Sequence, residues 1–577
     1  MLEIGRKDAN LTLPIKHAGI VAEVGVVAAD AAAEAAGAAG AAGAAEAAGT
    51  LASAPDGALV RPYQRSCSFN VSPGSSKASL QRKPTLSFEI VTRVPTAGWW
   101  ERKRLRSKTL LLARNYLSFV VVYLGSIIMF FTVLFFTDPR LDFLQAFYLC
   151  VSAATMTGLA SVDVKELKRS TEVLLALVIV FTSPMLMTLF PVAFRRRSFW
   201  LQEKEVQRSA SRLDVGNTRE HQIEYMALVH LTRTVLGYWI GVQLTAWLSL
   251  CAYFAVYPNP EIGGKSWDMV WWSLFGTISA FHNAGMTIRT NSLNDFHDEP
   301  FVLLVYGLLI LLGNTFYPIV LRAILWIWWK TSHGERRALA FRYLLDRPRR
   351  CYTHLFRARQ TVWLMIACVS LIVVQMLMQN MAEGSWVNVF TGEYLFMSVS
   401  SRTAGLSSMD LSNLEAPVVF VYTVSMYIAA SPVVVSMRSS TEVLDITGLT
   451  TAEEASRERD ELKALSSVQG QATRFMTQHQ LALVILVLVV LQLDQKGVKD
   501  NGGLGPVMFE FASAYGTVGL SMSKNAAAFS ASWTVISQLC LIIVMIMGRF
   551  RGHPDHIDVS VDLEWSRAPS ASGADVH

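Results

Sequence analysis

Eight apolar stretches alternate with polar segments along the chain from residue 115 onward. A bilayer core about 30 Å thick requires about 20 apolar residues when an α-helix crosses it. The stretches form four pairs, and between the members of each pair lies a shorter segment that is too polar or too short to span. The pattern therefore predicts four units, each with a first helix (M1), a re-entrant pore segment and a second helix (M2). The apolar stretches are 115–136, 171–194, 226–256, 301–329, 361–380, 416–437, 479–494 and 530–548, and the short segments are 142–160, 268–286, 386–406 and 507–521.

The composition fits a chain embedded in lipid. Of its 577 residues, 52% are hydrophobic and 17% are charged, whereas globular proteins average about 25% charged residues. We therefore expect an all-α membrane protein with four tandem M1–pore loop–M2 units around a central pore with pseudo-fourfold symmetry. The expected divisions are a disordered, low-complexity cytosolic N-terminus (1–95), the first unit (110–195), the second unit (220–330), a basic cytosolic linker (331–360), the third unit (361–438), a cytosolic linker (439–478), the fourth unit (479–550) and a cytosolic C-terminal tail (551–577).

Basic residues mark one side of the predicted membrane. They gather before the first stretch (101–108), after the second (195–208), after the fourth (330–360) and after the eighth, where Arg549 and Arg551 lie. All of these segments lie on one side if the stretches alternate in direction, and loops rich in Lys and Arg favour the cytosol. We therefore expect both termini in the cytosol. Because topology accounts for the net charge of +6, no nucleic-acid partner is expected.

The four short segments share one glycine position. Aligned on it, they read SAATMTG, SAFHNAG, VSSRTAG and SAYGTVG, and Leu or Met follows each glycine. One such glycine alone would indicate close helix packing, but four in register, about 120 residues apart, indicate an internal repeat. Irregular backbone at membrane depth is tolerated only where it is buried in protein or lines water. Four such turns around one axis can direct carbonyl oxygens at a dehydrated cation.

The candidate ion-binding residues are therefore the last three residues of each aligned segment. Nothing in the sequence indicates a catalytic site, because His, Asp and Glu do not cluster inside the apolar stretches. The six cysteines contain no C-x-x-C pair, so we expect neither a zinc site nor a disulfide framework. The chain is not expected to be an enzyme or to hold a cofactor or a metal beyond transported K⁺ or Na⁺. The candidate filter residues are Met156, Thr157, Gly158, Asn283, Ala284, Gly285, Thr403, Ala404, Gly405, Thr517, Val518 and Gly519.

The sequence resembles the superfamily of Trk, Ktr and HKT cation transporters over about residues 110–555. The motifs SAYGTVGLSMS, SAFHNAGMTIRTNS and GNTFYPIVLR carry this resemblance, and SAATMTGLASVDV and APVVFVYTVSMYIAASPVVVSMRS resemble the eukaryotic Trk branch known from fungi. The resemblance implies four pseudo-equivalent units around a single K⁺ pore, surrounded by membrane lipid and often assembled as a homodimer. The expected function is K⁺ uptake across the plasma membrane, driven by the membrane potential. An HKT-like Na⁺ or Na⁺/K⁺ transporter is the alternative.

A gate below the filter is also implied by the resemblance. Arg549 follows a glycine at the inner end of the eighth stretch and would contact an intramembrane loop of the third unit. The run YIAASPVV places that loop at 428–433, with Ala430, Ser431 and Pro432 at its centre. The alternative for Arg549 is anchoring at the lipid headgroups, a role that we expect Arg551 to fill.

Other charged or titratable residues lie close to the predicted pore. His282 has an unperturbed pKa near 6.5, so it is a candidate for pH modulation if its ring senses the pore. The alternative is a neutral histidine, hydrogen-bonded behind the loop. Arg402 is expected to be a scaffold residue, because a cation on the axis would repel K⁺. The acidic residues expected near the outer mouth are Asp163, Asp295, Asp298, Glu299 and Asp410.

Overall fold

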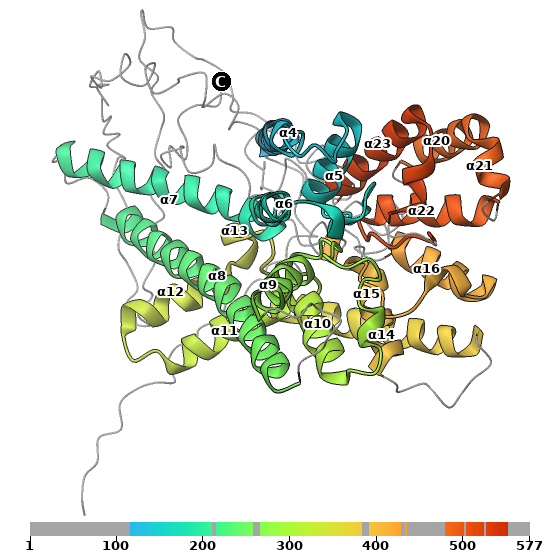
Figure 1. The fold of residues 1–577 in the computed structure, drawn as a ribbon. Helices are drawn as coiled ribbons and strands as arrows, with labels where there is room; N and C mark the ends of the chain where they lie inside the picture. Colours follow the sequence, from blue (N-terminus) through green and yellow to red (C-terminus); the bar gives the residue numbers. More distant parts are fainter. Residues whose placement is uncertain are drawn as a thin grey trace, which may run out of the picture. The chain divides into compact units, whose positions relative to one another are not determined.

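The computed structural model divides the chain into two units, residues 1–98 and 99–577. The structure describes residues 116–209, 215–257, 266–382, 392–428, 433–434, 479–500, 503–523 and 527–551, all in the second unit. These residues form helices and connecting loops, and no strand occurs among them (Figure 1). The all-α prediction is confirmed for this part of the chain. The predicted segments 1–95 and 439–478 lie outside the described residues, as does the tail beyond Arg551.

The helices follow the order of the four predicted units. The first unit contains α4 (Tyr116–Phe135), α5 (Phe143–Thr155), α6 (Arg169–Phe181) and α7 (Pro184–Ser209). The second contains α8 (Val215–Val256), α9 (Ser266–His282), α10 (Pro300–Gly313) and α11 (Tyr317–Thr331), and the linker contains α12 (Glu335–Asp346) and α13 (Pro348–Cys351). The third contains α14 (Ala358–Ala382), α15 (Gly392–Thr403) and α16 (Ala416–Ile428), and the fourth contains α20 (Gln480–Leu493), α21 (Gln495–Asp500), α22 (Leu504–Gly516) and α23 (Val535–Arg551). Short 3₁₀ turns are η1 (Val164–Glu166), η3 (Asn294–Phe296), η5 (Leu411–Asn413) and η6 (Phe529–Ser532).

Fewer helices could cross a membrane singly than the eight apolar stretches predict. Among the described residues, three helices are long and apolar enough, namely Tyr116–Phe135, Gln222–Val256 and Ala358–Met381. Two further spans are obtained if each of two bent pairs counts as one. The stretches 171–194 and 301–329 are these pairs, so neither is a single straight helix.

Proline explains both bends. A proline has no backbone N–H to donate within a helix, but it fits the first turn of one. Accordingly, α6 ends at Phe181 and α7 begins at Pro184 with a bend of 48°. The second bend, of 78°, separates α10 from α11, which has Pro318 in its first turn. Each proline therefore begins a new helix and does not merely kink a continuous one.

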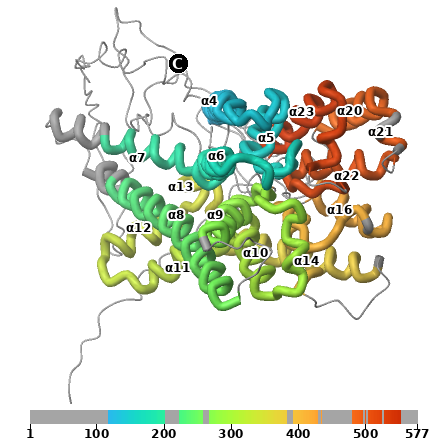
Figure 2. The backbone as a smooth tube through the Cα atoms, in the orientation of Figure 1, coloured from blue at the N-terminus to red at the C-terminus, as the bar shows by residue number. Residues whose placement is uncertain are grey.

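The helices form a closed ring of contacts. Within each predicted unit, three helices contact one another, as α4, α5 and α6 do in the first. Between units, α6 contacts α9, α10 contacts α15, and α16 contacts α22. The ring closes where α23 contacts α5, and these helices from opposite ends of the described chain lie side by side (Figures 1 and 2). The short helices α5, α9, α15 and α22 thus occupy equivalent places, each touching a helix of the preceding unit.

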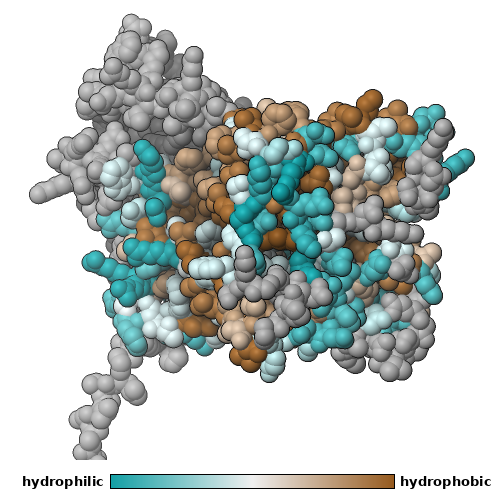
Figure 3. All heavy atoms as spheres, viewed as in Figure 1, coloured by the Kyte–Doolittle hydropathy of each residue, from teal (hydrophilic) through white to brown (hydrophobic). Residues whose placement is uncertain are grey.

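The outer surface of the ring is apolar. Phe130 and Val133 of α4 and Trp363 of α14 are each 62% exposed. Figure 3 shows brown, hydrophobic patches interspersed with teal, hydrophilic ones on the face that it displays. Large exposed apolar surfaces are rare on water-soluble monomers and mark contacts with protein or lipid. Together with the long apolar helices, this surface identifies a membrane protein.

Candidate functional site

The short helices α5, α9, α15 and α22 correspond to the predicted pore segments and are called the pore helices below. Three of the four end with the same backbone motif. In α5, the N–H of Thr157 donates to the carbonyl oxygen of Ser152 (2.9 Å), and the N–H of Met156 donates to that of Ala153 (3.2 Å). This pair of bonds is the Schellman motif, which requires a left-handed residue just after the helix. Met156 takes that conformation with φ 59°. The same pair of bonds joins Ala284 to Ser279 and Asn283 to Ala280 after α9, and Val518 to Ser513 and Thr517 to Ala514 after α22.

The left-handed residues are strained, because a non-glycine side chain crowds its own backbone there. Asn283 has φ 55° and Thr517 has φ 53°, and Thr517 is β-branched, which adds to the cost. Such strain persists only where the surroundings impose it, and it gathers at functional sites. The repeated strain two residues before each of three glycines therefore marks these loops as a candidate site.

The third loop closes differently, which the alignment of the four segments did not predict. Helix α15 continues to Thr403, and the carbonyl oxygen of Ser400 accepts from the N–H groups of both Ala404 (2.9 Å) and Gly405 (3.0 Å). Arg402 is buried, and its Nη1 lies 3.5 Å from the carbonyl oxygen of Cys368 on α14. This contact joins the third loop's helix to α14, and the scaffold role of Arg402 within the loop stays a prediction.

The four glycines bring the loops together. All have positive φ, at 90°, 71°, 67° and 103° in chain order, a region that glycine enters without steric cost. Each also leaves no room for a side chain, since a Cβ on Gly158 would lie 2.5 Å from the carbonyl oxygen of Ala284. Each glycine faces the carbonyl oxygen that precedes another glycine, in the pairs Gly158 with Ala284, Gly285 with Ala404, Gly405 with Val518, and Gly519 with Thr157. The loops therefore form a closed ring of backbone carbonyls.

The side chains of the candidate filter residues pack into the surrounding protein. Asn283 donates through Nδ2 to the carbonyl oxygens of Phe281 and Ile310, each at 3.3 Å. The hydroxyl of Thr157 lies 2.7 Å from that of Thr155 and is buried. These side chains are hydrogen-bonded within the surrounding protein, so the atoms through which the four loops face one another are backbone atoms.

A cavity of about 350 Å³ lies on one side of the ring. All four glycines line it, together with Asp163, Asp410 and Arg289. The other acidic residues expected at the mouth do not line the cavity. Asp295 pairs with Arg289, Asp298 with His297 and Glu299 with Tyr253. The cavity therefore presents two carboxylates and one arginine whose charge is offset by Asp295.

Hydrogen bonds tie the segments beyond the glycines to one another. Asp163 of the first unit accepts from the hydroxyl of Thr290 of the second at 2.9 Å. The carbonyl oxygen of Ser407 in the third unit accepts from the N–H of Leu293 in the second at 2.9 Å. The fourth and first units are joined by the N–H of Ala528, which donates to the carbonyl oxygen of Ala160 at 2.8 Å. These bonds brace the ring beside the cavity.

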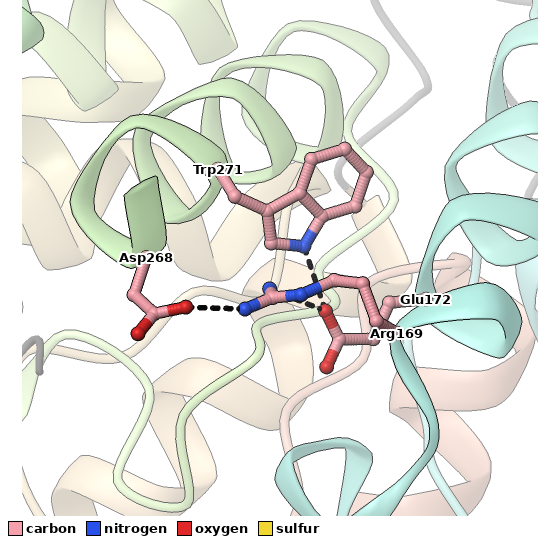
Figure 4. A network of polar contacts seen from close by, with 4 residues as sticks. All are labelled: Arg169, Glu172, Asp268 and Trp271. Carbon is pink, nitrogen blue, oxygen red and sulfur yellow. Dashed lines mark hydrogen bonds and ion pairs between the residues drawn. The ribbon is translucent and has the colours of Figure 1, made fainter. Parts of the chain in front are cut away.

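A polar cluster fixes the start of pore helix α9 against α6 (Figure 4). Arg169 contacts Glu172 at 2.9 Å and Asp268 at 2.6 Å, and its guanidinium lies 5.7 Å from the centre of the Trp271 ring. The indole N–H of Trp271 donates to the same oxygen of Glu172 at 2.7 Å. Glu172 is buried, whereas the Asp268 side chain is 40% exposed. The buried glutamate is therefore the centre of the cluster.

Replacing Glu172 with glutamine is expected to lower stability by about 1–3 kcal/mol, because the accepting oxygen stays but loses the negative charge that strengthens its bonds to two donors. Asp268→Asn is the matched control and should cost less than about 1 kcal/mol, because the exposed pair is screened by solvent. Thermal unfolding of both variants in lipid nanodiscs measures the difference. Equal losses for the two variants would show that Glu172 has no special place in the cluster.

His282 lies behind the second loop. Its ring is buried, and the indole N–H of Trp239 on α8 donates to its Nε2 at 3.3 Å. An indole nitrogen can only donate, so this contact requires an unprotonated Nε2 and places the proton of a neutral ring on Nδ1. The geometry supports the alternative of a neutral histidine over the hypothesis of pH modulation.

We therefore expect His282→Asn to leave the pH dependence of transport unchanged. The readout is ion flux between external pH 5 and 7.5 for parent and variant at matched surface expression. Trp239→Phe provides a second probe, because it removes the donor and leaves the histidine in place. Relief of acid inhibition in His282→Asn would restore the pH-sensing hypothesis.

Two arginines at the end of α23 have different partners. Arg549 donates through Nη2 to the carbonyl oxygen of Thr182 at the break between α6 and α7, and the same nitrogen lies 3.5 Å from the sulfur of Met187. Both contacts are with the first unit. The expected partner loop at 428–433, with Ala430, Ser431 and Pro432, lies outside the described residues except at its two ends.

Arg551 is buried, so the prediction that it anchors the chain at the headgroups is wrong. Its guanidinium lies 4.5 Å from the centre of the Tyr515 ring. Nη1 donates to the carbonyl oxygen of Tyr427 at 3.3 Å, and Nη2 lies 3.5 Å from that of Gly516. Arg551 thus joins the end of α16, beside the expected loop, to the end of pore helix α22. Arg549 and Arg551 lie two residues apart, and nothing in the sequence distinguishes the partner of one from the partner of the other.

A ring of glycine-bearing loops among apolar helices suits a protein that carries ions across a membrane. The chain belongs to the cation transport protein family TrkH, whose family model matches residues 99–568. The resemblance to the Trk, Ktr and HKT superfamily is thereby confirmed.

Fungal proteins are among its relatives. The potassium transporter TRK1 of Candida albicans is 32% identical over 359 residues, which cover 59% of this chain and 34% of that protein. The low-affinity potassium transport protein of Saccharomyces cerevisiae is 29% identical over 405 residues (60% and 45%), and potassium transport protein 1 of Schizosaccharomyces pombe is 32% identical over 360 residues (59% and 42%). The chain thus spans less than half the length of these relatives. A crystal structure of the potassium transporter TrkH from Vibrio parahaemolyticus matches with a TM-score of 0.45 and 13% identity, covering 76% of this chain and 82% of that one.

Proposed function

We propose that this chain takes up K⁺ through a pore enclosed by four M1–pore loop–M2 units. The observation that carries the proposal is the closed ring of four glycine loops, in which each glycine faces a backbone carbonyl oxygen of another loop. A ring of carbonyls can replace the hydration shell of a monovalent cation. Met156 to Gly158 and the three equivalent triplets are the proposed selectivity filter.

The electrostatics of the site suit a cation. Pore helices α5, α9, α15 and α22 all end at the loops, and the C-terminus of a helix carries a partial negative charge. Asp163 and Asp410 line the adjoining cavity, where carboxylates raise the local concentration of cations. Inward movement of one charge is favoured by about 2.3 kcal/mol per 100 mV of membrane potential. Uptake driven by the potential therefore needs no cofactor.

The names of the relatives favour K⁺ over Na⁺, since the three fungal proteins are all described as potassium transporters. No observation favours the HKT-like Na⁺ alternative. Residence in the plasma membrane, cytosolic termini and assembly as a homodimer complete the proposal. They rest on the superfamily and on the basic segments that follow alternate helices.

Growth of a K⁺-uptake-deficient cell on low K⁺ tests the proposal. The parent chain should restore growth, whereas Gly405→Ala should not, because a Cβ at residue 405 would overlap the backbone of Val518. Gly241→Ala in α8 is the matched control, since a Cβ there meets no atom within 4 Å. Fluxes measured with K⁺ and Na⁺ varied separately distinguish the two cations. A parent that reaches the surface but neither restores growth nor carries K⁺ would disprove the proposal.

A further inference from the structure

A carboxyl group lies fully buried in the fourth pore helix. Glu510 occupies the middle of α22, and no solvent reaches it. No ion pair within the described part of the chain includes it. Burying such a group is costly unless hydrogen bonds compensate, and an ionisable residue at membrane depth commonly serves function. Its partners therefore indicate what it does.

Those partners lie outside its own helix. One oxygen of Glu510 accepts both from the N–H of Ser530 (3.2 Å) and from its hydroxyl (2.8 Å). The Ser530 hydroxyl also lies 2.7 Å from the hydroxyl of Tyr148 on pore helix α5. Because Ser530 has one hydroxyl proton and gives it to Glu510, Tyr148 must be the donor to Ser530. A directed chain of hydrogen bonds thus runs from the first pore helix to the fourth.

The short turn η6 and the residue before it are also hydrogen-bonded to the segments that follow two of the filter glycines. Ser521, two residues beyond Gly519, accepts from the N–H of Phe529 at 2.8 Å. The preceding residue, Ala528, is bonded to Ala160, two residues beyond Gly158. Gln538 of α23 donates to three carbonyl oxygens in and around η6, those of Ser530, Ala531 and Trp533. The turn is therefore held to both loops, and Glu510 is its only hydrogen-bond partner on α22 among the described residues.

We propose that Glu510 is a positioning residue that sets the distance between the first and fourth filter loops and thereby the preference for K⁺ over Na⁺. Gly519 of the fourth loop packs against the carbonyl of Thr157 in the first. A shift of α22 relative to α5 therefore moves one side of the carbonyl ring, on whose geometry selection between cations depends. The inference rests on the proposed K⁺ transport and adds a determinant of its selectivity outside the filter.

Substitutions at Glu510 separate geometry from charge. Glutamine keeps the accepting oxygen in place and removes the charge, so Glu510→Gln should retain the parent's K⁺/Na⁺ flux ratio within about twofold. Alanine removes the acceptor and leaves two buried donors without a partner, so Glu510→Ala should lower the ratio by about tenfold. Both are measured at matched surface expression. A purely structural role would lower the amount of protein at the surface and leave the ratio unchanged.

Tyr148→Phe breaks the series of hydrogen bonds at its other end and leaves the buried carboxyl group unchanged. It should lower the flux ratio by about threefold, because one bond of the chain is lost. Tyr253→Phe, which removes a hydroxyl of α8 that is bonded to Glu299 at the start of α10, is the matched control and should keep the parent ratio. This pair of variants decides the question if Glu510→Ala does not reach the surface.

The outcomes separate this inference from the proposed function. A parent that carries no K⁺ would refute the proposed function itself. A parent that selects K⁺ while Tyr148→Phe and any surface-expressed Glu510→Ala keep its ratio would overturn only the role of Glu510. A loss of selectivity in Glu510→Gln as large as in Glu510→Ala would also overturn it, because the charge and not the position would then be the determinant.

Discussion

Replacing Gly158 with serine is expected to lower the permeability of K⁺ relative to Na⁺ by about tenfold or more, because a side chain there must displace the carbonyl ring. Gly158 has φ 90°, and a Cβ would lie 2.5 Å from the carbonyl oxygen of Ala284 and 3.0 Å from the Cα of Gly285. These are backbone atoms, so the second loop has to move. Reversal potentials in mixed K⁺ and Na⁺ solutions give the ratio.

The control for this substitution is Gly125→Ser in α4, where a Cβ meets no atom within 4 Å. It adds the same hydroxymethyl group to the same unit and should leave the ratio unchanged. If Gly158→Ser reduces only the amount of protein at the surface, and the remaining molecules select as the parent does, Gly158 is a packing residue. The filter would then have to be sought outside the four loops.

Replacing Arg549 with alanine is expected to raise K⁺ flux by about tenfold with selectivity retained, because a fixed positive charge raises the barrier for a passing cation. Arg549→Lys should keep most of that barrier. Arg549 also donates to the carbonyl oxygen of Thr182, so Arg549→Ala removes a hydrogen bond that holds α23 to the break between α6 and α7. Single-channel or whole-cell conductance at matched surface expression measures both variants.

Arg551→Ala should behave in the opposite way. Its guanidinium supports the carbonyl of Gly516, which directly precedes the fourth filter triplet, so its loss should lower selectivity and not raise flux. Two arginines with opposite effects would establish that one obstructs the pore and the other supports the filter. Equal conductance in the parent and Arg549→Ala would instead show that Arg549 is no barrier.

The repeat could be predicted from the sequence because it depends on backbone chemistry. A glycine that must adopt positive φ and touch a neighbouring carbonyl cannot be replaced, so Gly158, Gly285, Gly405 and Gly519 stand in register. Apolar length likewise predicted the order of the helices. Proline interrupts a helix, so breaks at Pro184 and Pro318 agree with the sequence, but the angle of a bend depends on the packing around it and not on the proline alone.

Side-chain partners from distant segments could not be predicted. Arg549 and Arg551 lie two residues apart, and only the three-dimensional structure places them against the first unit and against the end of α16, respectively. Glu510 is one carboxyl group in an apolar helix. Its proposed role depends on hydrogen bonds through Ser530 to Tyr148, which lies 382 residues from that serine in sequence. The different closure at Ser400 is also invisible in the alignment, because Thr403 occupies the position where the other loops have a left-handed residue.

The closure of the third loop has a consequence for how such a site changes over generations. In an assembly of four identical chains, one codon change alters every quarter of the ring at once, so intermediate states are not accessible. Here the four loops belong to one chain, and the third already departs from the other three in its backbone, because Thr403 is not left-handed and Ser400 accepts from both Ala404 and Gly405. Each quarter can therefore acquire its own substitution under its own selection. The ionic preference of the ring can then be adjusted in small, heritable increments, one loop at a time.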